Sequence, residues 1–302
     1  MFNSKLANDI HELIPSLRLR EGEPMSAHCS FRIGGPAELF AEPASERELV
    51  RLVSVLRYEA VPFLVIGNGT NLLVTDSGVR GVVIHLGEGF AGAQAEKNRI
   101  LAQGGITLAR LAVLAMEHSL AGLESAHGIP GSLGGAVVMN AGAYGGELKD
   151  VIKSVRVLCP DGGVRTFAAQ DCDFSYRHSR FDEGYIILGA EIELSHGEKG
   201  EISARMRELM SRRSASQPLD RPSAGSTFKR PAAGYAAAMI DEAGLKGYRI
   251  GGAAVSEKHA GFVVNLGGAS FDDVIAVMDH VQKTVLELTG TMLEPEVRII
   301  RG

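Results

Sequence analysis

The sequence predicts a globular fold of the α+β class, built of two or three domains. Its 302 residues are 45% apolar and 22% charged, which provides ample material for hydrophobic cores. Short apolar runs typical of strands are interleaved with amphipathic stretches typical of helices. From residue 201 the sequence pattern changes to a longer helix followed by a loop with several prolines. We therefore place a domain boundary near residue 200.

Composition and charge exclude several classes of protein. With a net charge of −5, the chain lacks the excess of basic residues that is typical of a nucleic-acid-binding protein. Cys29, Cys159 and Cys172 are odd in number and form no C-x-x-C pair, which argues against a disulfide framework and a zinc site. Lys5 and Asp9 interrupt the first apolar stretch, and no run of about eighteen apolar residues follows. We therefore expect a cytoplasmic protein with no nucleic-acid or membrane partner.

The first elements form a pattern similar to a βαβ unit. Residues 5–14 predict a short N-terminal helix, and the alternation over 37–41 predicts a strand. Ser45 and Glu48 have the spacing of a capping box and precede an apolar helix face of Leu49, Leu52, Val53 and Leu56. Residues 62–66 predict a buried strand.

A glycine loop follows that buried strand. Residues 67–72, GNGTNL, begin like the G-x-G-x-x-G fingerprint of dinucleotide-binding folds, but Leu72 stands in place of the third glycine. The next residues read as strand, so the helix whose N-terminus binds the diphosphate in that fold is missing. The loop could still cradle a phosphate through its own amides, and a plain glycine turn between strands is the alternative.

The most unusual stretch is the glycine segment, residues 128–146. It holds seven glycines and no charged side chain in nineteen residues. Ordering so many glycines costs much conformational entropy on folding. Such density indicates positive φ angles or main chain that approaches a ligand closely, because amide groups in concave turns can bind an anion without lysine. A tight-turn linker or a closely packed sheet corner is the alternative, but the apolar run AVVM and the lack of charged padding argue against a flexible linker.

The remaining elements follow from the same patterns. Thr107 predicts the cap of a helix that runs to about Leu120. From Glu201 the spacing of side chains predicts another helix, with Ile202, Met206, Leu209 and Arg213 on one face. A further helix is expected from Gly234 with Gly244 as its C′ residue, and a strongly periodic helix covers 274–288. Strands are predicted over 100–103, 152–158, 164–168, 185–194 and 262–266.

Three stretches carry side chains suited to binding or catalysis. In residues 175–181, SYRHSRF, two arginines and a histidine could orient an anion, and a solvated basic loop is the more common alternative. Ser226 lacks a G-x-S-x-G elbow, which argues against a nucleophilic serine. Its hydroxyl could donate a proton near Lys229, or cap a helix. Glu296 is expected in a strand near the C-terminus, where an ion pair with Arg298 would explain it.

Histidines give no sign of a metal site. None of the nine falls in an H-x-x-x-H pattern on a helix. His127 and His259 each stand near a glycine, and we interpret them as packing or turn residues. We therefore expect no metal.

In order along the chain, these segments resemble the UDP-N-acetylenolpyruvoylglucosamine reductase family, the flavoenzymes of early peptidoglycan synthesis. The motifs that carry the resemblance are FRIGGPA (31–37), GNGTNLLV (67–74), GIPGSLGGAVVMNAGAYG (128–145), YRHSRF (176–181), AGSTFKRP (224–231), LKGYRIGGAAVSEKHAGFVVN (245–265) and LEPEVR (293–298). The resemblance implies an FAD-binding fold of the vanillyl-alcohol-oxidase (PCMH) type. Two FAD-binding α/β subdomains, 1–80 and 81–200, would precede a substrate-binding domain, 201–302.

The resemblance also implies the site residues. It makes Arg177, Ser226 and Glu296 catalytic, and it places Tyr176, Lys229 and Lys246 at the substrate, the two lysines at its diphosphate. Arg230 stands where the family often has asparagine. The chain has no insertion between Phe181 and Gln217, which resembles the shorter subtype without a tyrosine lid. Non-covalent FAD would contact Gly67, Asn68, Gly69, Thr70, Asn71, Leu72, Gly128, Ile129, Pro130, Gly131, Ser132, Gly134, Gly135, Ala136, Asn140, Ala141, Gly142 and Ala143.

The implied reaction gives these residues complementary roles. NADPH would reduce the flavin, which would pass hydride to the vinyl carbon of UDP-GlcNAc-enolpyruvate. Arg177 would stabilise the charge that develops on the carboxylate, assisted by Glu296, and Ser226 would protonate the α-carbon. We expect a monomer that serves cell wall biogenesis and so cell shape and division. A flavin oxidase of the same fold and a non-catalytic nucleotide-binding regulator are the alternatives.

Overall fold

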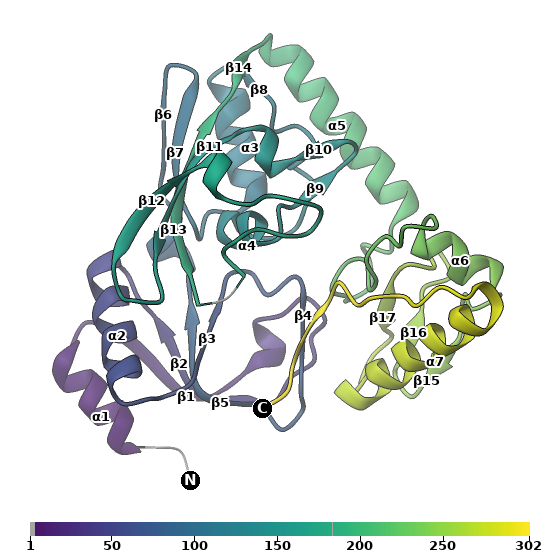
Figure 1. Cartoon of the computed structure of the whole chain (residues 1–302), viewed down its shortest axis with the longest axis horizontal. Helices are drawn as coiled ribbons and strands as arrows, with labels where there is room; N and C mark the ends of the chain where they lie inside the picture. Colours follow the sequence, from purple (N-terminus) through teal and green to yellow (C-terminus); the bar gives the residue numbers. More distant parts are fainter. Residues whose placement is uncertain (1–3, 183) are drawn as a thin grey trace. The chain divides into compact units, whose positions relative to one another are not determined.

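The computed structural model describes residues 4–182 and 184–302 and divides into two compact units that interleave along the sequence. The first unit is Met1–Glu21, Leu39–Asn68 and Gly81–Arg213, and the second is Gly22–Glu38, Gly69–Arg80 and Ser214–Gly302. Figure 1 colours the chain by residue number, so the two short excursions of the N-terminal third into the second unit can be followed there.

A four-stranded sheet has most of its residues in the first unit. Its order is β1 (Arg18–Pro24), β2 (Pro36–Glu42), β5 (Val79–His85) and β3 (Phe63–Ile66), and β3 runs parallel to β5. Two helices, α1 (Ser4–Leu13) and α2 (Glu46–Tyr58), contribute buried side chains to the same core cluster as residues of β2 and β5. The predicted apolar face of α2 is confirmed, since Leu49, Leu52, Val53 and Leu56 are all buried there.

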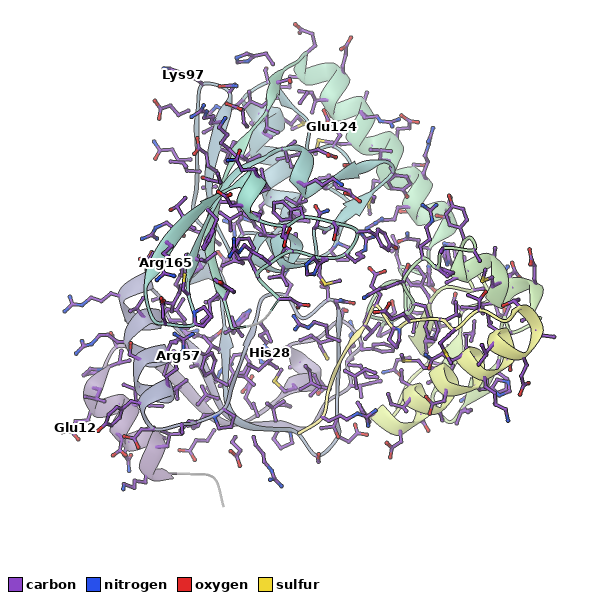
Figure 2. All side chains as sticks on the ribbon, in the orientation of Figure 1. Glu12, His28, Arg57, Lys97, Glu124 and Arg165 are labelled. Atoms are coloured by element: carbon purple, nitrogen blue, oxygen red, sulfur yellow. The ribbon has the colours of Figure 1, made fainter. Side chains whose placement is uncertain are left out.

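The start of α2 differs from a reciprocal capping box by one residue. Ser45 Oγ accepts from the backbone N of Glu48 at 3.3 Å, as the spacing predicts. The Glu48 carboxylate, however, accepts from the backbone N of Ala44 at 2.8 Å. Arg57, which Figure 2 labels, lies near the other end of the helix. It donates to the carbonyl of Cys159 at 2.9 Å, which ties α2 to the end of a strand of the next sheet.

An antiparallel five-stranded sheet forms the rest of the first unit's framework. Its order is β12 (Val164–Ala168), β11 (Ile152–Leu158), β13 (Ile186–Glu193), β7 (Arg99–Gln103) and β6 (Ala93–Glu96). Residues of α3 (Leu108–Glu117) and α4 (Leu133–Val138) pack in one hydrophobic core with those strands, and α5 (Lys199–Ser216) adds Ile202 and Met206. All four strands predicted here are confirmed.

The helix capped by Thr107 is shorter than predicted. Thr107 Oγ1 accepts from the backbone N of Arg110, which confirms the cap. The helix ends at Glu117, because Ser119 adopts a left-handed φ of 57° and turns the chain. Leu120 then belongs to β8 (Leu120–Ala121), a two-residue strand paired with β14 (Ser195–His196).

The second unit combines a small sheet with two helices. Its strands are β15 (Arg249–Ile250), β16 (Ala253–Val255) and β17 (Val263–Asn265), while β4 (Leu72–Val74) runs parallel to β18 (Arg298–Ile300). The helices are α6 (Ala236–Glu242) and α7 (Phe271–Thr289). Gly244 has a φ of 70° just after α6, as expected of a C′ glycine. The prediction of a strand at Glu296 is wrong, because β18 begins only at Arg298.

The N-terminus of α7 yields a test of stability against pH. Asp273 accepts from the backbone N of Gly252 and of Ser270, and these hydrogen bonds hold the pKa of Asp273 below its ordinary value of 3.8. A lowered pKa in the folded state stabilises the protein at neutral pH, and this contribution disappears as the pH falls through that pKa. We expect Asp273→Asn to cost about 0.3–1 kcal/mol of unfolding free energy at pH 7, the usual contribution of a carboxylate in the first helical turn, and much less at pH 2.

Chemical denaturation across that pH range measures the difference. Asp272→Asn is the matched control, because Asp272 is an exposed neighbour in the same helical turn. A destabilisation by Asp273→Asn that is constant from pH 7 to pH 2 would contradict the expectation.

Candidate active site

The glycine segment folds into a short helix and a hairpin. Residues 133–138 form α4, which begins after Ser132; the pattern of this glycine-rich stretch did not predict a helix there. Its last part is β9 (Gly142–Ala143) paired with β10 (Gly146–Glu147). Tyr144 and Gly145 between them both have positive φ, 53° and 88°, as a type I′ turn requires.

Two of the loops predicted to bind the cofactor meet in the first unit. A Cβ added to Gly67 would lie 2.0 Å from Ser132 Oγ, so the end of β3 packs directly against the start of α4. The loop at residues 104–106, which no sequence motif marks, holds this start in place. Leu133 N donates to Ile106 O at 2.8 Å, and Gly134 N donates to Gly104 O at 2.7 Å.

These observations fit a flavin dinucleotide. Gly67 leaves no room for a side chain beside Ser132, whereas Gly135 is exposed and has nothing nearer to its added Cβ than Ser132 Oγ at 3.8 Å. Exposed main chain without side chains is what a large flat ligand with a diphosphate needs from a protein surface. Residues 67–68 and 128–143 of the first unit could therefore hold FAD.

We expect Gly67→Ala to weaken FAD binding by about 5- to 150-fold, because the new methyl group would collide with Ser132 Oγ and cost about 1–3 kcal/mol in overpacking. Removing that oxygen in the double variant Gly67→Ala/Ser132→Ala should restore part of the affinity. Fluorescence titration of the apoprotein with FAD measures both. Gly200→Ala is the control, since nothing lies within 4 Å of its added Cβ. Undiminished affinity in Gly67→Ala would contradict this assignment.

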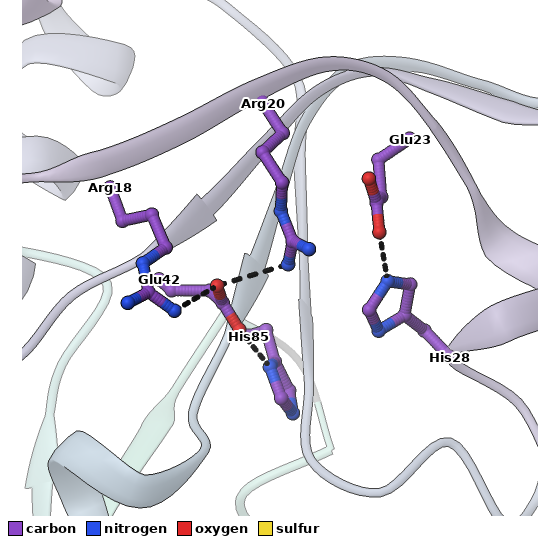
Figure 3. Close-up of polar contacts among 6 residues, drawn as sticks. All are labelled: Arg18, Arg20, Glu23, His28, Glu42 and His85. Atoms are coloured by element: carbon purple, nitrogen blue, oxygen red, sulfur yellow. Dashed lines mark hydrogen bonds and ion pairs between the residues drawn. The ribbon is translucent and has the colours of Figure 1, made fainter.

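A polar cluster at the carboxyl end of β5 supports the same loop. His85 pairs in register with Ile66, the residue before Gly67. Glu42 contacts His85 Nδ1 at 3.1 Å, Arg20 at 2.9 Å and Arg18 at 3.5 Å (Figure 3). Burial tends to raise the pKa of Glu42, but the hydrogen bond with His85 and the charge of Arg20 outweigh it, so this pKa is lowered. No sequence pattern reveals this cluster, because its residues lie far apart along the chain.

Arg177 lies at the centre of a tight turn. Ser175 and His178 exchange both backbone hydrogen bonds, at 3.1 and 3.2 Å, which leaves Tyr176 and Arg177 at the tip. Arg177 has a φ of 54°, a left-handed conformation that costs an arginine about 1–2 kcal/mol. Its Nη2 donates to the carbonyl of Gly142 at 3.2 Å. The structure thus joins the predicted catalytic arginine to the glycine segment.

Ser226 and Glu296 are brought together in the second unit. The backbone N of Glu296 donates to Thr227 O at 2.8 Å, and Lys229 N donates to Glu294 O at 2.8 Å. The two stretches therefore run side by side, antiparallel, with a bridge between Phe228 and Pro295. Ser226 is exposed next to the buried Thr227.

Asn71 secures the stretch that carries Glu296. Its Nδ2 donates to the carbonyl of Glu296 at 3.0 Å, and its own carbonyl accepts from Arg298 N at 2.9 Å. Nearby along the same loop, a Cβ on Gly69 would lie 2.0 Å from the carbonyl of His28, whose Nε2 contacts Glu23 at 2.7 Å (Figure 3). Residues 69–72 of the predicted FAD loop thus support Glu296 within the second unit.

Both predicted diphosphate lysines lie at the surface of the second unit with acidic partners. Lys229 Nζ contacts Glu294 at 2.5 Å, and Lys246 Nζ contacts Asp241 at 2.5 Å. Exposed ion pairs of this kind contribute little free energy, so a diphosphate could replace the carboxylates. Arg230 stacks on the ring of Tyr235, with its guanidinium carbon 3.8 Å from the ring centre.

His259 behaves as the turn residue that the sequence predicts. Its Nδ1 accepts from the backbone N of Gly261 at 3.1 Å, and burial lowers its pKa, so the ring is neutral at physiological pH. Gly261 O in turn accepts from Thr227 N at 2.8 Å, which supports the Ser226 loop. Within the described residues, 4–182 and 184–302, no three His, Cys, Asp or Glu side chains group as metal ligands would.

Membrane insertion through a helix finds no support in the described part of the chain. None of its helices combines the length and the apolar character that crossing a bilayer requires.

Comparison with known proteins supplies the family. Residues 37–168 match the model of an FAD-binding domain, and residues 217–300 match the C-terminal domain of UDP-N-acetylenolpyruvoylglucosamine reductase. The chain is 48% identical to the UDP-N-acetylenolpyruvoylglucosamine reductase of Caldanaerobacter subterraneus subsp. tengcongensis over 296 residues, 98% of each protein. It is also 48% identical to that of Agathobacter rectalis over 311 residues, 99% of each.

Solved structures agree. The crystal structure of the reductase from Thermus caldophilus matches with a TM-score of 0.80 at 35% identity, covering 94% of this chain and 99% of that one. A Physcomitrella patens BBE-like protein, at 17% identity and a TM-score of 0.50, covers 63% of this chain and 44% of its own and shares the fold alone. The α+β, FAD-binding fold of the vanillyl-alcohol-oxidase type is therefore confirmed. The chain belongs to the UDP-N-acetylenolpyruvoylglucosamine reductase family.

Proposed function

We propose that this protein uses NADPH and bound FAD to reduce UDP-N-acetylglucosamine enolpyruvate to UDP-N-acetylmuramate, a precursor of peptidoglycan. Family membership supports the reaction. The structural observation that carries the proposal is that hydrogen bonds hold the stretches bearing the three predicted catalytic residues. Arg177 is bonded to the glycine segment in the first unit, and Glu296 is bonded beside Ser226 in the second.

The cofactor assignment follows the loops described above. We assign FAD to residues 67–72, 128–136 (Leu133 excepted) and 140–143, largely through main chain. When bound, FAD supplies the hydride transfer from NADPH to the terminal vinyl carbon of the substrate. The chain itself must bind the substrate, stabilise the charge that this transfer creates and deliver one proton.

Arg177 is the group suited to the developing charge. Addition of hydride to the vinyl carbon pushes electrons toward the substrate carboxylate, and a fixed guanidinium lowers the energy of that state. Its turn holds the backbone in one conformation, so little rearrangement is needed when the charge appears. Glu296 assists this polarisation from the stretch secured by Asn71.

Ser226 is the proposed proton donor. Its hydroxyl is exposed at the surface of the second unit, where a substrate can reach it. It would give its proton to the α-carbon, which completes the lactyl ether product, and recover a proton from solvent. Tyr176, Lys229 and Lys246 are assigned to substrate binding, the lysines to the diphosphate.

The broader assignments follow from the same reaction. We propose FAD-binding subdomains at 1–80 and 81–200 and a substrate-binding domain at 201–302, in a monomer of the shorter subtype that acts in the cytoplasm. Its product would serve cell wall biogenesis and thereby cell shape, division and the cell cycle.

Anaerobic spectroscopy of the purified protein tests the reaction. The oxidised flavin band should disappear on addition of NADPH and return on addition of the enolpyruvyl substrate. Return of the band with oxygen but not with that substrate would indicate a flavin oxidase instead. A colourless protein that cannot be reconstituted with FAD would indicate a non-catalytic nucleotide-binding protein.

A further inference from the structure

Asn140 is a buried polar hub of the first unit. It is 0% exposed and has a left-handed φ of 40°, which asparagine tolerates better than most residues. Its Nδ2 donates to the carbonyl of Ser175 at 3.0 Å and to the carboxylate of Glu147 at 3.1 Å. Its Oδ1 accepts from the backbone N of Lys149 at 3.0 Å. The side chain that lies in the predicted cofactor segment thus engages three neighbours of the protein itself.

The contact with Ser175 reaches the turn that carries Arg177. Asn140 donates from the glycine segment to Ser175 O, while Arg177 donates from the turn to Gly142 O. Each pair of partners is spaced two residues apart on its own segment. Two hydrogen bonds in opposite directions therefore fix the turn at both its base and its functional side chain.

The negative charge of Glu147, next to Asn140, also favours this position of Arg177. The Glu147 carboxylate accepts from Lys149 Nζ at 2.5 Å as well as from Asn140. The pKa of Glu147 is lowered, first by the hydrogen bond from Lys149, with smaller contributions from Asn140 and the positive charge of Arg177. The ionised carboxylate attracts the guanidinium and needs the Asn140 amide as a donor.

We propose that Asn140 is a positioning residue that holds Arg177 in its reactive orientation and couples it to the glycine segment. The inference rests on the proposed role of Arg177 in the substrate half-reaction. The main chain of residue 140 remains available to border the cofactor, while its side chain serves the arginine.

The arrangement predicts a selective kinetic defect. Asn140→Ala removes both donors to the turn and the hub, and a misplacement of a catalytic group by about 1 Å can cost on the order of 100-fold in rate. We expect a loss of that order in the reoxidation of reduced flavin by the enolpyruvyl substrate. Reduction of the flavin by NADPH should change little, because Arg177 acts on the substrate carboxylate.

A double-mutant cycle with Arg177→Lys separates positioning from general stabilisation. If Asn140 acts through Arg177, then Asn140→Ala should cause no further loss in the Arg177→Lys background. Additive losses would overturn the proposal, and so would equal losses in the two half-reactions.

Ser179→Ala is the matched structural control. Ser179 is also 0% exposed, and its Oγ donates to Val138 O at 2.9 Å, so it links the same two stretches beyond the turn. It should lower the melting temperature without splitting the half-reactions. A split as large as that of Asn140→Ala would overturn the proposal. Should Asn140→Ala fail to fold or retain FAD, Asn140→Gly takes its place, since glycine adopts the φ of 40° without strain and likewise lacks the amide that donates to Ser175.

The failure of the proposed function is distinguishable from the failure of this inference. Wild-type reduced enzyme that is not reoxidised by the enolpyruvyl substrate would refute the function. In that event nuclear magnetic resonance of 15N-arginine-labelled protein tests positioning alone. Asn140→Ala should sharpen and shift the Arg177 side-chain signal, assigned by its loss in Arg177→Lys, and an unchanged signal would overturn the inference.

Discussion

Ser226→Ala is expected to leave flavin reduction by NADPH intact while slowing reoxidation by the enolpyruvyl substrate by about 10²–10⁴-fold, the usual contribution of a positioned general acid. The hydroxyl is exposed and Thr227 beside it carries the hydrogen bonds of the loop, so its removal should not disturb the fold. Anaerobic stopped-flow absorbance follows each half-reaction separately. Flavin content and melting temperature should equal those of the wild type.

The comparison variant for that experiment is Ser223→Ala in the same loop. The carbonyl of Ser223 accepts from Ser30 Oγ at 2.6 Å, and this contact survives loss of the side chain. Ser223→Ala should therefore behave as wild type in both half-reactions. Ser226 would lose its assignment as proton donor if its variant slowed both half-reactions equally, or if Ser226→Ala and Ser223→Ala behaved alike.

Much of the local structure could be predicted because it depends on neighbours in sequence. The cap of α3 at Thr107 and the buried face of α2 follow from short-range hydrogen bonds and helical periodicity. β1, with the sequence RLREGEP, was not anticipated, since its polar residues hide the strand pattern. The helix α4 contains Gly134 and Gly135, which disfavour helix in isolation, and it is held by hydrogen bonds to Gly104 and Ile106.

The candidate site shows the same division. Ser226 and Glu296 could be singled out as residues, but the antiparallel pairing of Phe228 with Pro295 that brings their stretches together is non-local. The position of Glu296 before β18 likewise depends on Asn71, more than two hundred residues earlier in the chain. Periodicity within a segment carries no information about such partners, which explains why the role of Asn140 was also invisible.

Arg177→Gly should separate stability from activity. Glycine adopts the φ of 54° without strain, so relief of the left-handed backbone offsets about 1 kcal/mol of what the lost side-chain contacts cost. The melting temperature should therefore fall less than that of Arg177→Ala. Loss of the guanidinium should nevertheless slow reoxidation by substrate by about 10²–10³-fold, the usual effect of removing a donor to developing charge.

Arg177→Lys separates the charge of the side chain from its geometry, because it keeps the charge but not the planar fork that binds a carboxylate through two donors. Its rate should lie between those of the wild type and Arg177→Gly. Arg180→Gln controls for the loss of a nearby exposed cation, since Arg180 donates to the carbonyl of Asp171 and not to the glycine segment. If Arg180→Gln matched Arg177→Gly in the substrate half-reaction, the general positive potential of this stretch, rather than Arg177 itself, would stabilise the reacting carboxylate.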